Sequence, residues 1–231
     1  MLAIWGVGLG LGGLAGPALA ARQPVVVELF TAQGCSSCVG SNQVIADLAD
    51  NPRVLPLTFA VDYWDYLGWT DTFAKPEFTG RQRAYMSAFG LREIYTPQLV
   101  VDGRLQVAAL PLNQAEALVR QAQKGPRDPP DIVFRADKTR VLVGVGKAPR
   151  GGADVWLIRY DPRDQQVVVK TGENRGKTVG ERNVVRQLVR LGAWSGRSKA
   201  YRLPAADNDG LRQVVIVQAP KGGKILAAKL D

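Results

Sequence analysis

The sequence predicts an α/β protein with a mixed sheet and flanking helices over residues 24–125, followed by a smaller, mostly antiparallel β domain over residues 130–231. Two observations support this fold class. Short β-branched runs alternate with longer amphipathic runs in the first part, as in βαβ units, whereas apolar segments separated by glycine-rich turns fill the second part. Between the two parts, the sequence KGPRDPPDIVF concentrates proline, glycine and charge, which indicates a domain boundary.

A signal peptide is predicted over residues 1–20, because this run is apolar, glycine-rich and uncharged and ends in Ala18-Leu19-Ala20, the small-residue pattern of a cleavage site. An N-terminal membrane anchor is the alternative, but the apolar stretch is short for a spanning helix. No later segment is apolar enough to cross a bilayer. We therefore expect a periplasmic or secreted protein without a transmembrane span in its mature chain.

The first domain is expected to begin with a strand, a helix and a second strand. Residues 25–30 form a mostly β-branched run that predicts a buried strand. Apolar residues at helical spacing over 44–49 predict a helix that ends at Asn51-Pro52, because proline disfavours the helical conformation in the residue before it. Residues 53–61 predict the next strand.

A second helix, a hairpin and a third helix complete this domain. The helix is predicted over residues 75–90 and ends at Gly90. Two short strands follow, joined by Asp102-Gly103, the strongest hairpin signal in the chain, and the last helix covers residues 112–123. A right-handed crossover makes the first two strands parallel, while the hairpin adds antiparallel strands.

Three sequence features are expected to meet at one edge of this sheet. They are the turn GCSSC after the first strand, DYWDYLGW after the second strand, and YTPQ before the hairpin. The carboxyl ends of parallel strands share one edge, and the first hairpin strand begins at that same edge. We therefore expect the functional site there.

The turn GCSSC holds both cysteines of the chain, Cys35 and Cys38. Cys35 follows Gly34 and would lie at a helix N-terminus, where free amides and the helix dipole lower a thiol pKa from about 8.5 and favour the attacking thiolate. Cys38 lies three residues later on the same helical face, close enough to resolve a mixed disulfide. The prediction is a nucleophile, Cys35, and a resolving thiol, Cys38, whose redox-active disulfide needs no further cofactor.

Other chemistries for the cysteine pair fit the sequence less well. The chain has no histidine, which excludes Cys-His and Ser-His-Asp catalysis and removes the commonest metal ligand, so we predict no metal site. In an oxidising compartment the pair could also be a fixed disulfide, and this alternative stays open. The segment TGENRGKTVG lacks the spacing and the following helix of a phosphate-binding loop, which argues against nucleotide binding.

Residues of the two neighbouring loops are candidates for supporting roles. A cis bond between Thr96 and Pro97 would turn the backbone toward the cysteines. Asp62 or Asp65 could relay a proton to or from Cys38, because a partly buried carboxylate has a raised pKa, although such acids are more often helix caps or hydrogen-bonding anchors.

Aromatic side chains are concentrated in the loop after the second strand. With Thr96 they could line a groove for an extended peptide, or they could pack over the second helix. These aromatic residues are Tyr63, Trp64, Tyr66 and Trp69.

The motif around Cys35 and Cys38, placed between a strand and a helix, together with Tyr95-Thr96-Pro97 before a hairpin, resembles the thioredoxin superfamily. VELFTAQGCSSC, VDYWDYLGW, RQRAY, YTPQLVVDGR and ENRGKTVGERNVVRQL resemble family 1223, a domain of unknown function found in exported bacterial proteins. The resemblance covers most of the mature chain and implies a thioredoxin-like N-terminal domain with a redox-type cysteine motif, but no substrate. Val39 stands where a proline often follows the second cysteine, and the Ser36-Ser37 pair differs from well-known sites, so no redox potential can be transferred.

The excess of positive over negative charge is confined to the second half of the chain. Residues 1–126 hold 9 Lys+Arg against 10 Asp+Glu, and residues 127–231 hold 21 against 11, a net charge of +10. This favours contact with anionic surfaces of the cell envelope, whereas nucleic acid is disfavoured because export separates the protein from it. A merely solvated basic surface is the simpler alternative. Within this half, RNVVRQLVRLGAW suits a helix or a strand, and we favour the strand.

Taken together, these features predict an exported thiol-disulfide oxidoreductase that acts on protein thiols or disulfides. The second hypothesis is a non-catalytic binding or structural module of the envelope, in which Cys35 and Cys38 form a fixed disulfide.

Overall fold

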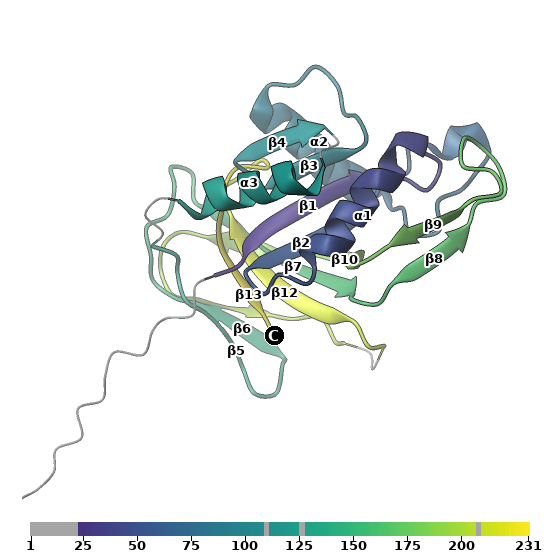
Figure 1. Cartoon of the computed structure of the whole chain (residues 1–231). Helices are drawn as coiled ribbons and strands as arrows, with labels where there is room; N and C mark the ends of the chain where they lie inside the picture. The colour runs from purple at the N-terminus through teal and green to yellow at the C-terminus, as the bar shows by residue number, and fades with distance from the viewer. Residues whose placement is uncertain (1–22, 109–110, 125–127, 207–208) are drawn as a thin grey trace, which may run out of the picture.

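The computed structural model describes residues 23–108, 111–124, 128–206 and 209–231. Figure 1 shows a central twisted sheet with helices packed against it. The signal peptide predicted over residues 1–20 lies outside the described residues. In the described part of the chain, no helix is long and apolar enough to cross a membrane.

An eight-stranded mixed sheet with the order β13-β12-β7-β10-β2-β1-β3-β4 forms the centre of the molecule. β1 and β2 pair in parallel, and β3 and β4 add antiparallel strands, as the sequence predicts. The predicted fold class is confirmed. The strands of this sheet are β1 Val25–Thr31, β2 Val54–Ala60, β3 Gln98–Val101, β4 Leu105–Ala108, β7 Ala153–Asp161, β10 Val184–Trp194, β12 Arg212–Gln218 and β13 Ile225–Leu230.

β10 connects the two halves of the chain within this sheet. It pairs in parallel with β2 through Val184 and Thr58, and antiparallel with β7. The Thr58 amide donates to Asn183 O at 3.0 Å, and Thr58 Oγ1 donates to Arg182 O at 2.7 Å. Strands from both halves thus share one sheet, and the division into two domains near residues 125–130 stays a prediction.

The remaining strands of the second half form two small antiparallel sheets. β8 (Gln165–Val168) and β9 (Thr178–Glu181) make a hairpin closed by loop 169–177. The segment RNVVRQLVRLGAW belongs to the long strand β10, so the favoured strand interpretation is confirmed. The third sheet has the order β11-β6-β5, with β5 Ile132–Phe134, β6 Arg140–Val143 and β11 Lys199–Arg202.

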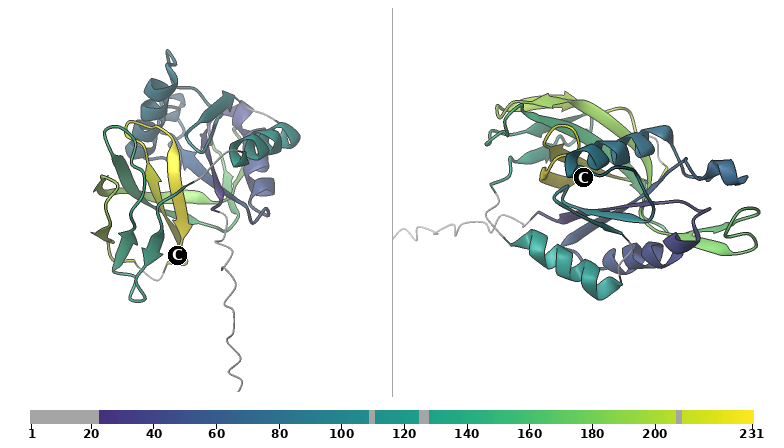
Figure 2. Two further views of the ribbon diagram at one scale, coloured as in Figure 1. Left: turned by 90° about the vertical axis from the view of Figure 1, so that its left-hand side faces the viewer. Right: turned by 90° about the horizontal axis from the view of Figure 1, so that it is seen from above.

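Helices cover both faces of the first part of the sheet. α1 (Val39–Leu48) and α3 (Leu112–Gln123) lie on one face and α2 (Pro76–Phe89) on the other, as the view from above in Figure 2 shows. α2 ends at Gly90 with a φ of 66°, the left-handed conformation that glycine adopts without strain. Alternation along β1 divides its side chains between two cores: Val25, Val27 and Leu29 pack with α1 and α3, and Val26 and Phe30 pack with α2, β7 and β12.

The hairpin between β3 and β4 has the predicted turn. Asp102 and Gly103 both have positive φ values, 49° and 60°, and the Arg104 amide donates to Val101 O at 2.9 Å, so Asp102 and Gly103 are the central residues of a tight turn between the two strands. A Cβ atom on Gly103 would lie 2.4 Å from Gly223 O, so the close approach of the loop before β13 also requires glycine.

A buried ion pair explains the motif RQRAY on α2. Arg81 Nε donates to Glu28 Oε1 at 2.7 Å, and the two side chains are 5% and 0% exposed. Tyr85 donates to the same Glu28 carboxylate and accepts a hydrogen bond from Gln218 Nε2 at 3.0 Å. The pair therefore connects β1, α2 and β12 in the core, where each charge depends on its partner.

Removing one partner of this pair should be costly. We expect Arg81→Met to lower the free energy of unfolding by about 3–5 kcal/mol, because it leaves the Glu28 charge buried without a counter-ion. The double variant Glu28→Leu/Arg81→Met should recover much of that loss. Urea denaturation of both variants measures this, and equal losses in the single and double variants would show that the unpaired charge is not the cause.

Candidate functional site

The three loops expected at one sheet edge do meet there. Thr96 Oγ1 donates to Cys35 Sγ at 3.5 Å, and Trp64 Nε1 donates to Thr96 Oγ1 at 2.8 Å. The Thr96–Pro97 peptide bond is cis. The loop after β2 and the loop before β3 are therefore joined to the cysteine turn through one threonine hydroxyl.

Cys35 and Cys38 form a disulfide, with their Cα atoms 5.4 Å apart. Cys35 precedes a 3-10 turn, η1 (Ser36–Cys38), that continues into α1, so the pair lies at the N-terminal end of a helix. Ser37 Oγ lies 3.4 Å from Cys35 Sγ. Both cysteines are 0% exposed, a feature that the sequence did not predict. A partner thiolate cannot reach either sulfur in this conformation.

The two candidate proton-relay acids hold the loop that follows β2. Asp62 Oδ1 accepts a hydrogen bond from Thr79 Oγ1 on α2 at 2.6 Å, and Asp65 Oδ1 accepts one from the Asp71 amide at 3.1 Å. These are the contacts of hydrogen-bonding anchors. A relay role for either acid toward Cys38 stays a prediction.

The aromatic residues of this loop have different environments. Tyr63 and Trp64 are partly buried against the core beneath α2, and burial raises the pKa of Tyr63 to about 12. Trp69 Nε1 donates to Gln33 Oε1 at 3.0 Å. Tyr66, in the short 3-10 turn η2 (Asp65–Leu67), is 82% exposed. A substrate groove formed by these side chains and Thr96 stays a prediction.

Gln33 links several segments around the backbone that precedes the cysteines, and no sequence pattern predicted this role. This fully buried side chain accepts from Trp69 and from Thr72, and its Nε2 donates to Glu181 Oε2 at 3.1 Å. The backbone amide of Gln33 donates to Asp71 Oδ2 at 2.6 Å. The site thus contains two buried acids, Asp71 from the loop after β2 and Glu181 from β9, and both accept hydrogen bonds from Gln33.

Burial controls the ionisation of both acids. Burial first, and then the nearby Asp71 charge, raise the pKa of Glu181 to about 8, against a hydrogen bond from Gln33 that lowers it. Burial also raises the pKa of Asp71, against three backbone amides that lower it. Glu181 Oε1 has no hydrogen-bond partner among the described residues. We infer that Glu181 is mostly protonated at neutral pH.

Loop 169–177 lies against the cysteine turn, a contact that no sequence pattern predicted. Glu173 Oε2 accepts from the Ser36 amide at 3.0 Å and from Ser36 Oγ at 2.8 Å. Asn174 Nδ2 donates to Gln33 O at 2.9 Å and to Cys35 O at 3.0 Å, and this asparagine is fully buried. Figure 1 shows the β8–β9 hairpin extending to the N-terminal end of α1. The one sequence signal for this segment is its family motif ENRGKTVGERN, which does not indicate a contact with the cysteines.

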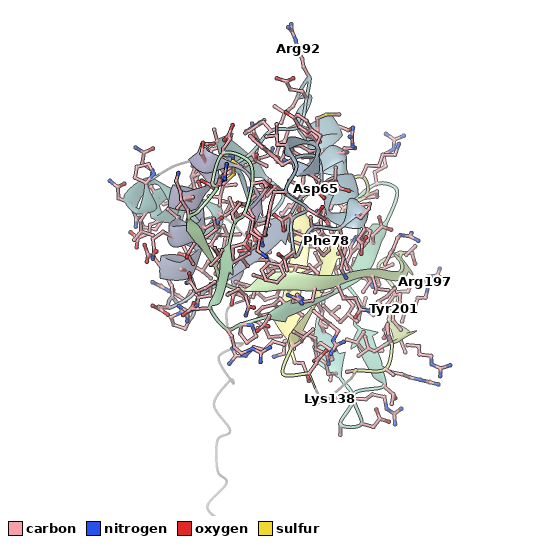
Figure 3. The ribbon with its side chains drawn as sticks, turned by 90° about the vertical axis from the view of Figure 1, so that its right-hand side faces the viewer. Asp65, Phe78, Arg92, Lys138, Arg197 and Tyr201 are labelled. Carbon is pink, nitrogen blue, oxygen red and sulfur yellow. A yellow bond between two sulfur atoms is a disulfide. The ribbon has the colours of Figure 1, made fainter. Side chains whose placement is uncertain are left out.

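The basic residues of the second half do not all face this site. Figure 3 places Lys138 and Arg197 well away from Asp65. Several of the cations have acidic partners: Lys138 pairs with Asp231 at 2.8 Å, and Arg163 pairs with Asp161 at 2.7 Å. This pairing reduces the charge available to an anionic surface, so contact with the envelope stays a prediction.

Comparisons with known proteins agree with the geometry. The family model described as "Protein of unknown function (DUF1223)" matches residues 26–218. The crystal structure of protein AGR_C_4864 from Agrobacterium tumefaciens is 31% identical, with a TM-score of 0.72 over 91% of this chain and 95% of that one. HBP35 of Porphyromonas gingivalis is 14% identical, with a TM-score of 0.58 over 91% of this chain and 75% of that one, and shows the fold alone. No curated protein matches the chain. The N-terminal part has a thioredoxin-like fold.

The buried carboxyl of Glu181 should make stability depend on pH. Its pKa is about 8 in the folded protein and near 4.5 when unfolded, so the folded state keeps a proton that the unfolded state loses. Stability is therefore expected to fall as pH rises from about 4.5 to about 8. Glu181→Gln should flatten this part of the curve and raise the melting temperature at pH 8 relative to the unsubstituted protein.

Thermal unfolding across this pH range measures the effect. Glu116→Gln, on the half-exposed face of α3, is the control and should keep the unsubstituted slope. An unchanged slope in Glu181→Gln would contradict the assignment of a buried, protonated carboxyl.

Proposed function

The chain belongs to the family DUF1223, and from this membership and its thioredoxin-like fold we propose that it exchanges thiols and disulfides with partner proteins through Cys35 and Cys38. One observation carries the proposal. The Cys35–Cys38 disulfide lies where β1 passes into α1, beside the cis Thr96–Pro97 bond, and Cys35 Sγ accepts a hydrogen bond from Thr96. In this position a thiolate at Cys35 gains from the helix N-terminus.

The exchange proceeds in two steps. A partner thiolate attacks Cys35 Sγ, the bond between Cys35 and Cys38 breaks, and Cys38 leaves as a thiolate that takes up a proton. A second partner thiolate then attacks the partner sulfur of this mixed disulfide and releases the Cys35 thiolate. Two electrons have passed from the partner dithiol to the cysteine pair, and the partner holds the new disulfide. The same steps in reverse reduce a partner disulfide.

The proposed compartment is the periplasm or the extracellular space. The apolar run over residues 1–20, which ends in a cleavage-type pattern, supports export. Disulfides form and persist in these compartments, so partner proteins with exchangeable cysteines are available there.

A second candidate function is favoured by the burial of the pair. Both cysteines are 0% exposed, as expected of a fixed disulfide in a binding or structural module. The two candidates differ in a measurable property, because a structural disulfide resists reduction by glutathione whereas an exchanging one does not.

Replacement of the resolving thiol tests the proposal. In Cys38→Ser, the Cys35 thiolate can attack a partner disulfide and release one partner thiolate, but the resulting mixed disulfide cannot be resolved. Covalent complexes with disulfide-containing proteins should therefore accumulate and disappear on reduction. Cys35→Ser is the matched control and should trap far fewer complexes. Non-reducing electrophoresis with mass spectrometry detects the complexes. A reduction potential below about −300 mV together with no complexes in Cys38→Ser would establish the fixed disulfide instead.

We also propose that the basic second half contacts anionic surfaces of the envelope, since residues 127–231 hold 21 Lys+Arg against 11 Asp+Glu. Vesicles with anionic lipids should retain the protein at low salt and release it at high salt, because salt screens exposed charges. Neutral vesicles are the control. No retention at low salt would overturn the lipid form of this contact.

A further inference from the structure

We propose that loop 169–177 is a latch over the exchange site, in which Asn174 and Glu173 are positioning residues that keep Cys35 covered and lower its reactivity. This rests on the proposed function, because it describes how the same cysteine pair is regulated. The latch comes from the β8–β9 hairpin, more than a hundred residues along the chain from the cysteine turn to which it is hydrogen-bonded.

The loop is held to both sides of the site. On one side, Asn174 bonds to the carbonyls of Gln33 and Cys35. On the other side, Thr171 Oγ1 donates to Gly68 O, in the loop that follows β2, at 2.5 Å. The latch thus bridges the cysteine turn and the aromatic loop. A partner that approaches Cys35 between them must displace it.

The latch has a defined conformation of its own. The Gly176 amide donates to Val169 O at 2.8 Å, and the Lys177 amide donates to Asn174 O at 2.9 Å. Gly172 and Gly176 both have a φ of 78°, which lets the loop turn back tightly above the hairpin. At its base, Glu181 bonds to Gln33 and β9 packs beside α1. Opening can therefore be confined to the loop while the hairpin stays in place.

Asn174 controls access to the sulfurs. It is fully buried, and its amide group satisfies two backbone carbonyls that flank Gly34. Loss of both hydrogen bonds favours local opening of the loop, because buried carbonyls then gain by contact with water. Opening exposes Cys35, and the rate at which a small reductant attacks the disulfide follows the open population.

Glu173 controls the charge at the site. Its carboxylate accepts both the amide and the hydroxyl of Ser36, and these bonds lower the pKa of Glu173, as does Lys177 in the same loop. This negative charge, next to Ser36, disfavours a thiolate at Cys35. Its hydrogen bond also uses the Ser36 amide, which is then not free to stabilise the thiolate. The other acids near the turn, Asp71 and Glu181, accept hydrogen bonds from Gln33 and are unchanged in every variant of the latch.

The two roles have separate readouts. Glu173→Gln removes the charge and keeps a hydrogen-bond acceptor, so iodoacetamide alkylation of the reduced protein at neutral pH should quicken about five-fold, with the pH profile moved to lower pH. High salt should shrink this difference, because Glu173 is exposed. Asn174→Ala should speed reduction of the disulfide by dithiothreitol about ten-fold, with little dependence on salt.

Arg175→Gln provides the control, since it changes an exposed charge of the same loop. It should change alkylation less than Glu173→Gln does, and in the opposite direction. The latch would be overturned if Glu173→Gln were alkylated at the same rate as the unsubstituted protein. It would also be overturned if the disulfide of Asn174→Ala were reduced at the same rate as that of the unsubstituted protein. Both assays use small reagents, so they report on the latch even if Cys38→Ser traps no partner protein. If Cys38→Ser traps partners but the alkylation and reduction rates of the latch variants are unchanged, the proposed function is supported and the latch is not.

Discussion

The pairing of β10 with β2 is the interaction on which the candidate site depends. It is short, with Val184 opposite Thr58, and is reinforced by hydrogen bonds that Thr58 makes to Asn183 and Arg182 and by one from Asn183 Nδ2 to Pro56 O at 2.8 Å. β9 ends just before these residues, so the pairing fixes the β8–β9 hairpin at the carboxyl edge of β1. The loop of that hairpin can then lie over the cysteine turn.

The site is therefore composite. The thioredoxin-like part supplies Cys35, Cys38 and Thr96, and the second half supplies Glu173, Asn174 and Glu181. Polar groups buried at this junction reduce stability unless they are hydrogen-bonded. The side-chain amide of Gln33 donates to Glu181, and that of Asn174 donates to the carbonyls of Gln33 and Cys35. A disulfide that is covered in this way does not exchange continually with other thiols. The complete burial of Cys35 and Cys38 is therefore compatible with their position at a helix N-terminus, where exchanging disulfides occur.

Much of the first half could be predicted from the sequence because its signals are local. Strand, helix and hairpin boundaries near Asn51-Pro52, Gly90 and Asp102-Gly103 depend on the conformational limits of proline and glycine. The latch could not be predicted, since Glu173 and Ser36 are 137 residues apart and no periodicity records such a contact. For the same reason Gln33 was overlooked, because its role comes from partners on three separate segments.

The order of strands in the sheet also has a consequence for protein solubility. β2 is an interior strand whose burial is complete along its length, and β10 is its neighbour on the side away from β1. Without the second half, β2 would become an edge strand, because its Thr58 amide and Pro56 carbonyl would lose their partner Asn183 beside the buried Leu57 and Phe59. Such an edge is a template for pairing with other chains. The second half thus protects the thioredoxin-like part from self-association, independently of any role in redox chemistry.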